Sequence, residues 1–238
     1  LQLASSMGGS LPFVVHRYAG AELRAKVAEL ARDADLVHFD MLPLMACANQ
    51  VPSGVPIVYN AHNVEHVLLR ARGDNESRPL HRAFLRSQID RLSRFEAVAS
   101  RRADLVLACS EQDRAQLVDL GARTAITVPN GVDLDGNRPG TDDEDGSLVF
   151  VGQMCWFPNR DGIEWFLSDV LPRVLARKPG LRFTLVGKAQ GMQVPANVAA
   201  NVDVTGFVDD LRPLVQRASV YVVPLRMGSG TRLKVLEA

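Results

Sequence analysis

At 238 residues the chain is long enough for two domains of ordinary size, because a single hydrophobic core stops growing at roughly 250–300 residues. Hydrophobic residues make up 47% of the chain and charged residues 23%, which excludes an intrinsically disordered chain and a membrane-embedded one. Lys plus Arg and Asp plus Glu are equal at 27 each, so no global field draws the protein to nucleic acid or to an acidic polymer.

Short apolar, β-branched runs bounded by turn residues recur along the chain and predict strands. Most of these runs are continuous rather than alternating, as in LVLAC and LVFVG, which is typical of parallel sheets with both faces covered. The predicted strands are Asp35–Asp40, Pro56–His62, Asp104–Ser110, Ile126–Asn130, Leu148–Gly152, Arg182–Gly187, Val202–Phe207 and Val220–Pro224.

Helical stretches separate these strands, and each is long enough to serve as a crossover between parallel strands. The alternation predicts an α/β fold made of parallel, doubly wound sheets. The predicted helices include Ala21–Arg32, Leu80–Arg101, Glu111–Leu120, Gly162–Arg177 and Asp209–Ala218.

The segment NGVDLDGNRPGTDDEDG replaces the periodic pattern with Gly, Pro and acidic residues. We therefore expect a linker at residues 139–146 between an N-terminal domain at 1–138 and a C-terminal domain at 147–238, with a cleft between them. Both domains are expected to be incomplete, since the first lacks an opening strand and the second ends soon after a strand and loop.

The three cysteines, Cys47, Cys109 and Cys155, are odd in number and far apart. This argues against a disulfide framework and against zinc ligation by paired cysteines. No run approaches the roughly 20 apolar residues of a spanning helix, and the first residues lack the pattern of a signal peptide. We expect a cytoplasmic protein.

The last segment, PLRMGSGTRLKVLEA, combines a strand end, a glycine loop and a helix that is expected to start near Thr231. Backbone N–H groups and the dipole at a helix start favour a phosphate. Arg226, Arg232 and Lys234 add positive charge, so the segment could hold a diphosphate. The alternative is a plain strand-to-helix turn capped by Ser229.

The segment FVGQMCWFPNRDG likewise places glycine and polar residues at a strand end. Gly152 permits close backbone approach, and Asn159 and Arg160 have side chains that can reach an anion. Packing is the alternative role for Trp156 and its two neighbours.

The segment HNVEH, from His62 to His66, matches the inverted spacing of some zinc peptidases. That chemistry needs both histidines one turn apart on a single helix, whereas His62 closes a predicted strand. We therefore favour a polar His62 at a strand tip, with a hydrogen-bonded structural histidine as the alternative. No metal site is expected.

The predicted helix Leu80–Arg101 is basic and amphipathic, a pattern that could contact anionic lipid. The alternative is an ordinary crossover helix with its polar face in water. No GxGxxG, P-loop, serine elbow or EF-hand loop is found, which disfavours those classes of protein.

The ordered motifs resemble the retaining glycosyltransferases of the two-Rossmann-domain (GT-B) kind, specifically family 4. The resemblance implies metal-independent transfer of a hexosyl group from a nucleoside-diphosphate sugar, with no cofactor, to a sugar, lipid or polysaccharide acceptor. The motifs that carry it are DLVHFD, PIVYNAHNVE, ADLVLACSE, ITVPNGVD, LVFVGQM with PNRDG, FTLVGK, VTGFVDDLRPLVQRASVYVVPL and GSGTRLKVLEA.

The resemblance also assigns roles to residues. Glu237 is expected to bind the ribose of the nucleotide, and His62 to approach the donor sugar. The donor sugar and diphosphate would contact the loop made by Gly228, Ser229, Gly230 and Thr231. The nucleobase would lie beside Phe207, Val208 and Asp209.

The chain departs from the family pattern at two places. A glutamate that contacts a sugar hydroxyl usually stands where Ser229 is found. With Ser229 in that place, the expected catalytic residues are His62, Ser229 and Glu237. Gln153 stands where arginine is common, and the usual nearby lysine is replaced by Asn159 or Arg160. Arg226, Arg232 and Lys234 are expected to compensate for the lost positive charge.

These departures leave other functions open. The alternatives are a non-catalytic nucleotide-sugar-binding protein, and an epimerase or phosphorylase on the same scaffold. The expected setting is polysaccharide or glycoconjugate synthesis in the cytoplasm, with contact to the inner membrane face as a further possibility.

Overall fold

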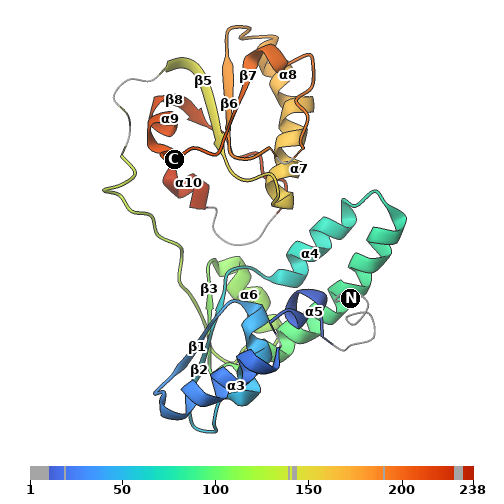
Figure 1. Ribbon diagram of the computed structural model, residues 1–238, viewed down its shortest axis with the longest axis vertical. Coiled ribbons are helices and arrows are strands. Elements are labelled where there is room, and N and C mark those ends of the chain that lie inside the picture. Colours follow the sequence, from blue (N-terminus) through green and yellow to red (C-terminus); the bar gives the residue numbers. More distant parts are fainter. Residues whose placement is uncertain (1–10, 19, 139, 141–143, 190, 228–232) are drawn as a thin grey trace. The chain divides into compact units, whose positions relative to one another are not determined.

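The computed structural model describes residues 11–18, 20–138, 140, 144–189, 191–227 and 233–238. They form two compact units, one comprising the described residues up to Asn130 and the other those from Gly131 onward. Each unit has its own parallel sheet (Figure 1). Each also has its own hydrophobic core. The predicted domain boundaries at residues 138 and 147 stay a prediction.

The N-terminal unit is built on a parallel sheet with the strand order β1-β2-β3-β4. Asp40 and Asn60 are register partners on β1 and β2, so the carboxyl ends of these two strands lie side by side. The strands are β1 (Val37–Asp40), β2 (Ile57–Ala61), β3 (Leu105–Ala108) and β4 (Ala125–Thr127).

Helices pack against this sheet because their apolar side chains are buried together with those of the strands. The long helix α5 contributes Leu92 to the core that contains Ile57 and Tyr59 of β2, and it buries Leu85 and Ile89 beside Gly73 of α4. The helices are α2 (Phe13–His16), α3 (Ala21–Leu30), α4 (Glu65–Asp74), α5 (Pro79–Arg102) and α6 (Glu111–Asp119), with a 3₁₀ segment at Leu42–Gln50.

The C-terminal unit has a second parallel sheet, in the order β7-β6-β5-β8. The long central strand β5 pairs with β6 on one side and with β8 on the other. The strands are β5 (Glu144–Val151), β6 (Arg182–Val186), β7 (Val202–Gly206) and β8 (Ala218–Tyr221).

The core of this unit forms where helical residues pack on β5 and β6. Ile163 and Leu167 are fully buried, and the rings of Phe166 and Phe183 lie 5.0 Å apart. The helices are α7 (Phe157–Trp165), α8 (Leu171–Leu175), α9 (Arg212–Arg217) and α10 (Leu233–Glu237), with a π turn at Phe166–Val170 between α7 and α8.

The predicted α/β class is confirmed, and each predicted strand is present with one or both ends shifted. Strand β5 begins at Glu144, inside the expected linker, and β8 ends at Tyr221 instead of Pro224. The helix predicted at 162–177 was wrong in its extent. It begins earlier, at Phe157, and is interrupted by the π turn before Pro172, which has no N–H to donate to a helical carbonyl.

Candidate functional site

Gly152 follows β5 at a point where the chain has no room for a side chain. A Cβ atom there would lie 2.7 Å from Nδ2 of Asn159, 2.9 Å from Nζ of Lys234 and 3.0 Å from the Phe150 ring. The three predicted donor residues Gly152, Asn159 and Lys234 are therefore brought together, although they come from three different elements.

Asn159 and Lys234 are hydrogen-bonded to each other. Lys234 Nζ donates to Asn159 Oδ1 at 3.1 Å, and Asn159 Nδ2 donates to the Gln153 carbonyl at 3.0 Å. The ammonium group also lies 4.9 Å from the centre of the Phe150 ring, and burial lowers the pKa of Lys234. An ammonium has three N–H donors, so phosphate oxygens could accept hydrogen bonds here beside Asn159.

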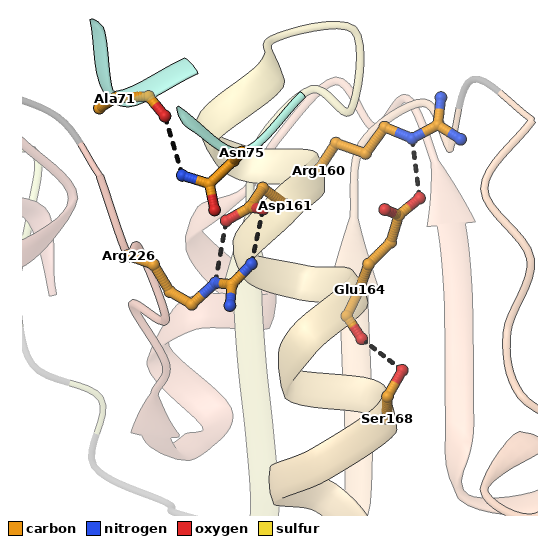
Figure 2. Close-up of polar contacts among 7 residues, drawn as sticks. All are labelled: Ala71, Asn75, Arg160, Asp161, Glu164, Ser168 and Arg226. Atoms are coloured by element: carbon orange, nitrogen blue, oxygen red, sulfur yellow. Dashed lines mark hydrogen bonds and ion pairs between the residues drawn. The ribbon is translucent and has the colours of Figure 1, made fainter. Parts of the chain in front are cut away.

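Two of the arginines predicted to bind the donor are engaged in ion pairs within this unit. Arg226 donates to both carboxylate oxygens of Asp161, and Arg160 donates from Nε to Oε1 of Glu164 at 2.8 Å (Figure 2). Their charges are therefore offset locally, and Lys234 is the described cation that lies beside Gly152.

A cavity of about 820 Å³ lies in the same unit. Glu237 lines it together with Tyr221 and Asp209. Burial, and then the negative charge of Glu237, raise the pKa of Tyr221 to about 12. The cavity is large enough for a nucleoside and presents carboxylates that can accept hydrogen bonds from ribose hydroxyls.

The predicted nucleobase residues are only partly collected at this cavity. Asp209 lines it, whereas Phe207 and Val208 do not belong to its lining and the Phe207 side chain is 70% exposed. Five predicted residues lie outside the described part of the chain: Gly228, Ser229, Gly230, Thr231 and Arg232.

In the N-terminal unit, His62 lies just beyond the end of β2 and contacts a carboxylate on the neighbouring strand. His62 Nε2 and Asp40 Oδ1 are 2.7 Å apart, and Asn60 Nδ2 donates to the same oxygen at 2.8 Å. Hydrogen bonds from His62 and Asn60 lower the pKa of Asp40. The carboxylate holds the imidazole in one orientation, so His62 can present its other ring nitrogen to a polar ligand at the carboxyl ends of the strands.

Sequence reasoning missed Asp40. The available signal was its place as the last residue of the predicted strand DLVHFD, beside the strand that delivers His62. Parallel neighbours end at the same edge of a sheet, but the order of the strands had to be known before the two residues could be paired.

Sequence reasoning also missed Glu96, a fully buried carboxylate on α5. It accepts hydrogen bonds from the backbone N–H groups of Glu65 and His66, at 2.8 and 3.3 Å, and from His66 Nδ1 at 2.6 Å. Glu96 thereby caps the start of α4 and holds the chain that follows His62.

The two histidines of HNVEH therefore have different partners. His66 lies in α4 and contacts Glu96, whereas His62 precedes that helix and contacts Asp40. They are not one turn apart on a single helix, which the inverted zinc-peptidase arrangement requires. Among the residues that the structure describes, no group of three or more His, Cys, Asp or Glu side chains is arranged to hold a metal ion.

Two family models together cover almost the whole chain. The model described as Glycosyl transferases group 1 matches residues 145–238, and the model described as Glycosyltransferase Family 4 matches residues 8–135. The chain belongs to glycosyltransferase family 4. The two matched segments correspond to the two α/β units, and this architecture agrees with the GT-B fold expected from the sequence.

Two curated relatives of this family 4 chain are similar in sequence. The D-inositol 3-phosphate glycosyltransferase of Segniliparus rotundus is 29% identical over 190 residues, which are 71% of this chain and 39% of the relative. An uncharacterized 44.6 kDa protein in the cps region of Klebsiella pneumoniae is 24% identical over 101 residues, 39% of this chain and 26% of the relative. The alignments thus span well under half of each curated relative.

Solved structures of similar fold include TarM, with a TM-score of 0.67 and 13% identity over 90% of this chain and 41% of that one. Sucrose-phosphate synthase from Thermosynechococcus elongatus has a TM-score of 0.65 and 18% identity, over 91% of this chain and 58% of that one. The pneumococcal O-GlcNAc transferase GtfA, solved in complex with UDP and GlcNAc, has a TM-score of 0.61 and 13% identity, over 91% and 42%. At these identities the likeness shows the fold alone.

Proposed function

We propose that this family 4 member transfers a hexosyl group from a nucleoside-diphosphate sugar to an acceptor hydroxyl, with retention of configuration and without a catalytic metal. The observation that carries the proposal is the pairing, within one compact unit, of a nucleoside-sized cavity lined by Glu237 with the Lys234, Asn159 and Gly152 cluster. GtfA, which shares the fold, was solved with UDP bound.

The cavity and the cluster have separate roles in the proposed reaction. Glu237 accepts hydrogen bonds from the ribose hydroxyls, and Lys234 donates to the diphosphate as negative charge develops on it. Positive groups placed in advance stabilise a leaving group without proton transfer, so cations suffice where a metal would otherwise be needed. The donor site of this proposal also includes five residues outside the described part of the chain: Gly228, Ser229, Gly230, Thr231 and Arg232.

The N-terminal unit supplies His62, which approaches the donor sugar in the proposal. Asp40 orients the imidazole by its contact with Nε2. The acceptor is a sugar, lipid or polysaccharide, and the setting is polysaccharide or glycoconjugate synthesis in the cytoplasm. The similarity to a protein in a cps region supports that setting.

The proposal is tested by nucleotide binding to the parent and to Glu237→Ala. At about a hundredfold excess over the dissociation constant, one nucleoside diphosphate is expected to stabilise the parent by roughly 2.7 kcal/mol. The variant loses hydrogen bonds to a charged group, so its affinity is expected to fall about tenfold or more. Thermal unfolding against a panel of nucleoside diphosphates measures both.

Asp203→Ala is the matched control, because Asp203 is exposed on β7 and is not part of the cavity lining. It should bind nucleotide as the parent does. Equal affinity in parent and Glu237→Ala, or no response to any diphosphate, would remove the proposed donor site. Once the nucleotide is known, NMR of the product with the matching sugar donor reports whether the anomeric configuration is retained.

Peripheral contact with an anionic membrane is a second part of the proposal. Helix α5 buries its apolar side in the N-terminal unit, but Leu80 at its start is 87% exposed, close in sequence to Arg78 and Arg86. An exposed apolar side chain at the start of a basic helix suits an anionic bilayer surface, where each nearby cation contributes about 1 kcal/mol, although the charge of Arg78 is offset by Glu76. Among the described residues, no helix is both long and apolar enough to cross a bilayer.

Vesicle sedimentation tests this contact. We expect the protein to sediment with vesicles of phosphatidylglycerol and phosphatidylcholine, and much less with phosphatidylcholine alone or in high salt. Leu80→Asp should weaken the binding, whereas Leu134→Asp, at an exposed leucine of the other unit, should not. Equal sedimentation of parent and Leu80→Asp would contradict a contact through the start of α5.

A further inference from the structure

The start of α7 packs directly on the backbone that precedes the glycine-rich segment. A Cβ atom on Gly162 would lie 2.5 Å from the carbonyl oxygen of Pro224 and 3.1 Å from its carbonyl carbon. Only glycine permits this approach without moving the backbone. The chain between β8 and the glycine-rich segment is therefore held against α7.

A forked ion pair joins the same two segments. Arg226 Nε lies 3.0 Å from Asp161 Oδ2, and Nη2 lies 2.6 Å from Oδ1 (Figure 2). The Asp161 side chain is only 11% exposed, and the guanidinium carbon of Arg226 lies 5.7 Å from the centre of the Trp165 ring. A bidentate pair of this kind fixes orientation as well as distance, which a single contact does not.

The same turn of α7 also holds the chain after the glycine-rich segment. Asn159, two residues before Asp161, accepts the hydrogen bond from Lys234 in α10. Residues 159–162 therefore contact the chain on both sides of the segment 227–233, at Pro224 and Arg226 before it and at Lys234 after it.

We propose that residues 159–162 of α7 form a platform that holds the chain at Arg226 and at Lys234, with Asp161 as its positioning residue. The inference rests on the proposed function, because the position of Lys234 matters only if it contacts the donor. It gives Arg226 a different role from the one expected from the sequence. Arg226 aligns the chain through its forked contact with Asp161, and Lys234 contacts the phosphates.

The test is donor kinetics and ligand affinity in Asp161→Asn and Arg226→Lys. Asparagine keeps the shape of Asp161 but loses its charge, and lysine keeps the charge of Arg226 but loses the fork. Both variants are expected to raise the KM for the nucleotide sugar and weaken nucleoside-diphosphate binding by about tenfold, as for one charge-assisted hydrogen bond. Affinity for the nucleoside alone, which uses the Glu237 cavity, and the KM for the acceptor should be unchanged.

Glu111→Gln is the matched control. Glu111 also forms a forked pair, with Arg114 in the N-terminal unit, and is not part of the proposed site. Its loss should leave both affinities unchanged. The inference is overturned if Asp161→Asn alters only the unfolding temperature, or if nucleoside and nucleoside-diphosphate affinities fall equally. Glu237→Ala is measured alongside, since normal nucleotide binding by that variant would refute the proposed function instead.

Discussion

Replacement of Gly187 by alanine is expected to destabilise the C-terminal unit by about 3 kcal/mol or more. Gly187 has a φ of +131°, which side chains rarely permit, and a Cβ atom would lie 2.1 Å from the carbonyl oxygen of Gly152. The neighbour is backbone of the adjacent strand end, so it cannot move aside cheaply. Urea unfolding followed by tryptophan fluorescence measures the loss, since Trp156 and Trp165 both lie in this unit.

Gly180→Ala provides the control within the same unit. A Cβ atom on Gly180 would have no neighbour within 4 Å, and its φ is not in the left-handed range. Its effect should stay within about 0.5 kcal/mol of the parent. If Gly187→Ala unfolds at the same urea concentration as Gly180→Ala, the result would contradict the close contact between Gly187 and Gly152 after β6 and β5. Nucleotide binding should fall together with stability in Gly187→Ala, because Gly152 belongs to the candidate donor site.

Replacement of Glu96 by alanine is expected to destabilise the N-terminal unit by about 3 kcal/mol. The carboxylate is fully buried and accepts three hydrogen bonds, two of them from backbone N–H groups at the start of α4. Alanine leaves these donors without their partner and opens a cavity beside them. Circular dichroism during urea unfolding reports the change in the free energy of unfolding.

Two variants calibrate this loss. Glu96→Gln keeps the shape and one acceptor oxygen, so it should cost less than alanine. Glu29→Ala removes an exposed carboxylate whose pair with Lys26 lies at the surface, and it should change stability by no more than about 1 kcal/mol. A loss in Glu96→Ala no larger than that in Glu29→Ala would show that the buried carboxylate does not hold α4.

The extent of the helices shows where sequence reasoning succeeded and where it failed. The helix predicted at Leu80–Arg101 is α5, Pro79–Arg102. Its apolar residues recur at helical spacing over most of its length, so its two ends could be placed to within one residue. Helix α4 and the 3₁₀ segment at Leu42–Gln50 were not predicted. Part of what stabilises α4 is a buried carboxylate 31 residues away in sequence, which no local window contains.

In the candidate site, too, sequence reasoning found some residues correctly and missed the partners of others. Gly152, Asn159 and Lys234 were selected from the sequence, and the structure brings them together. Arg160 and Arg226 were selected for their positive charge and their place near a strand end or glycine loop, and the structure engages both with acidic partners. Charge type is visible in a sequence, but the partner of a charge depends on which segments pack against each other.

The sequence by itself determined the α/β class, the parallel strands, and which glycine and polar residues follow the strands. These depend on periodicity and on turn residues, which act over a few positions along the chain. Only the tertiary structure decided that Asp40 meets His62, that Glu96 caps α4 and that Asp161 holds Arg226. The residues in these contacts are 22, 31 and 65 positions apart, and they meet because strand order and helix packing place their elements side by side.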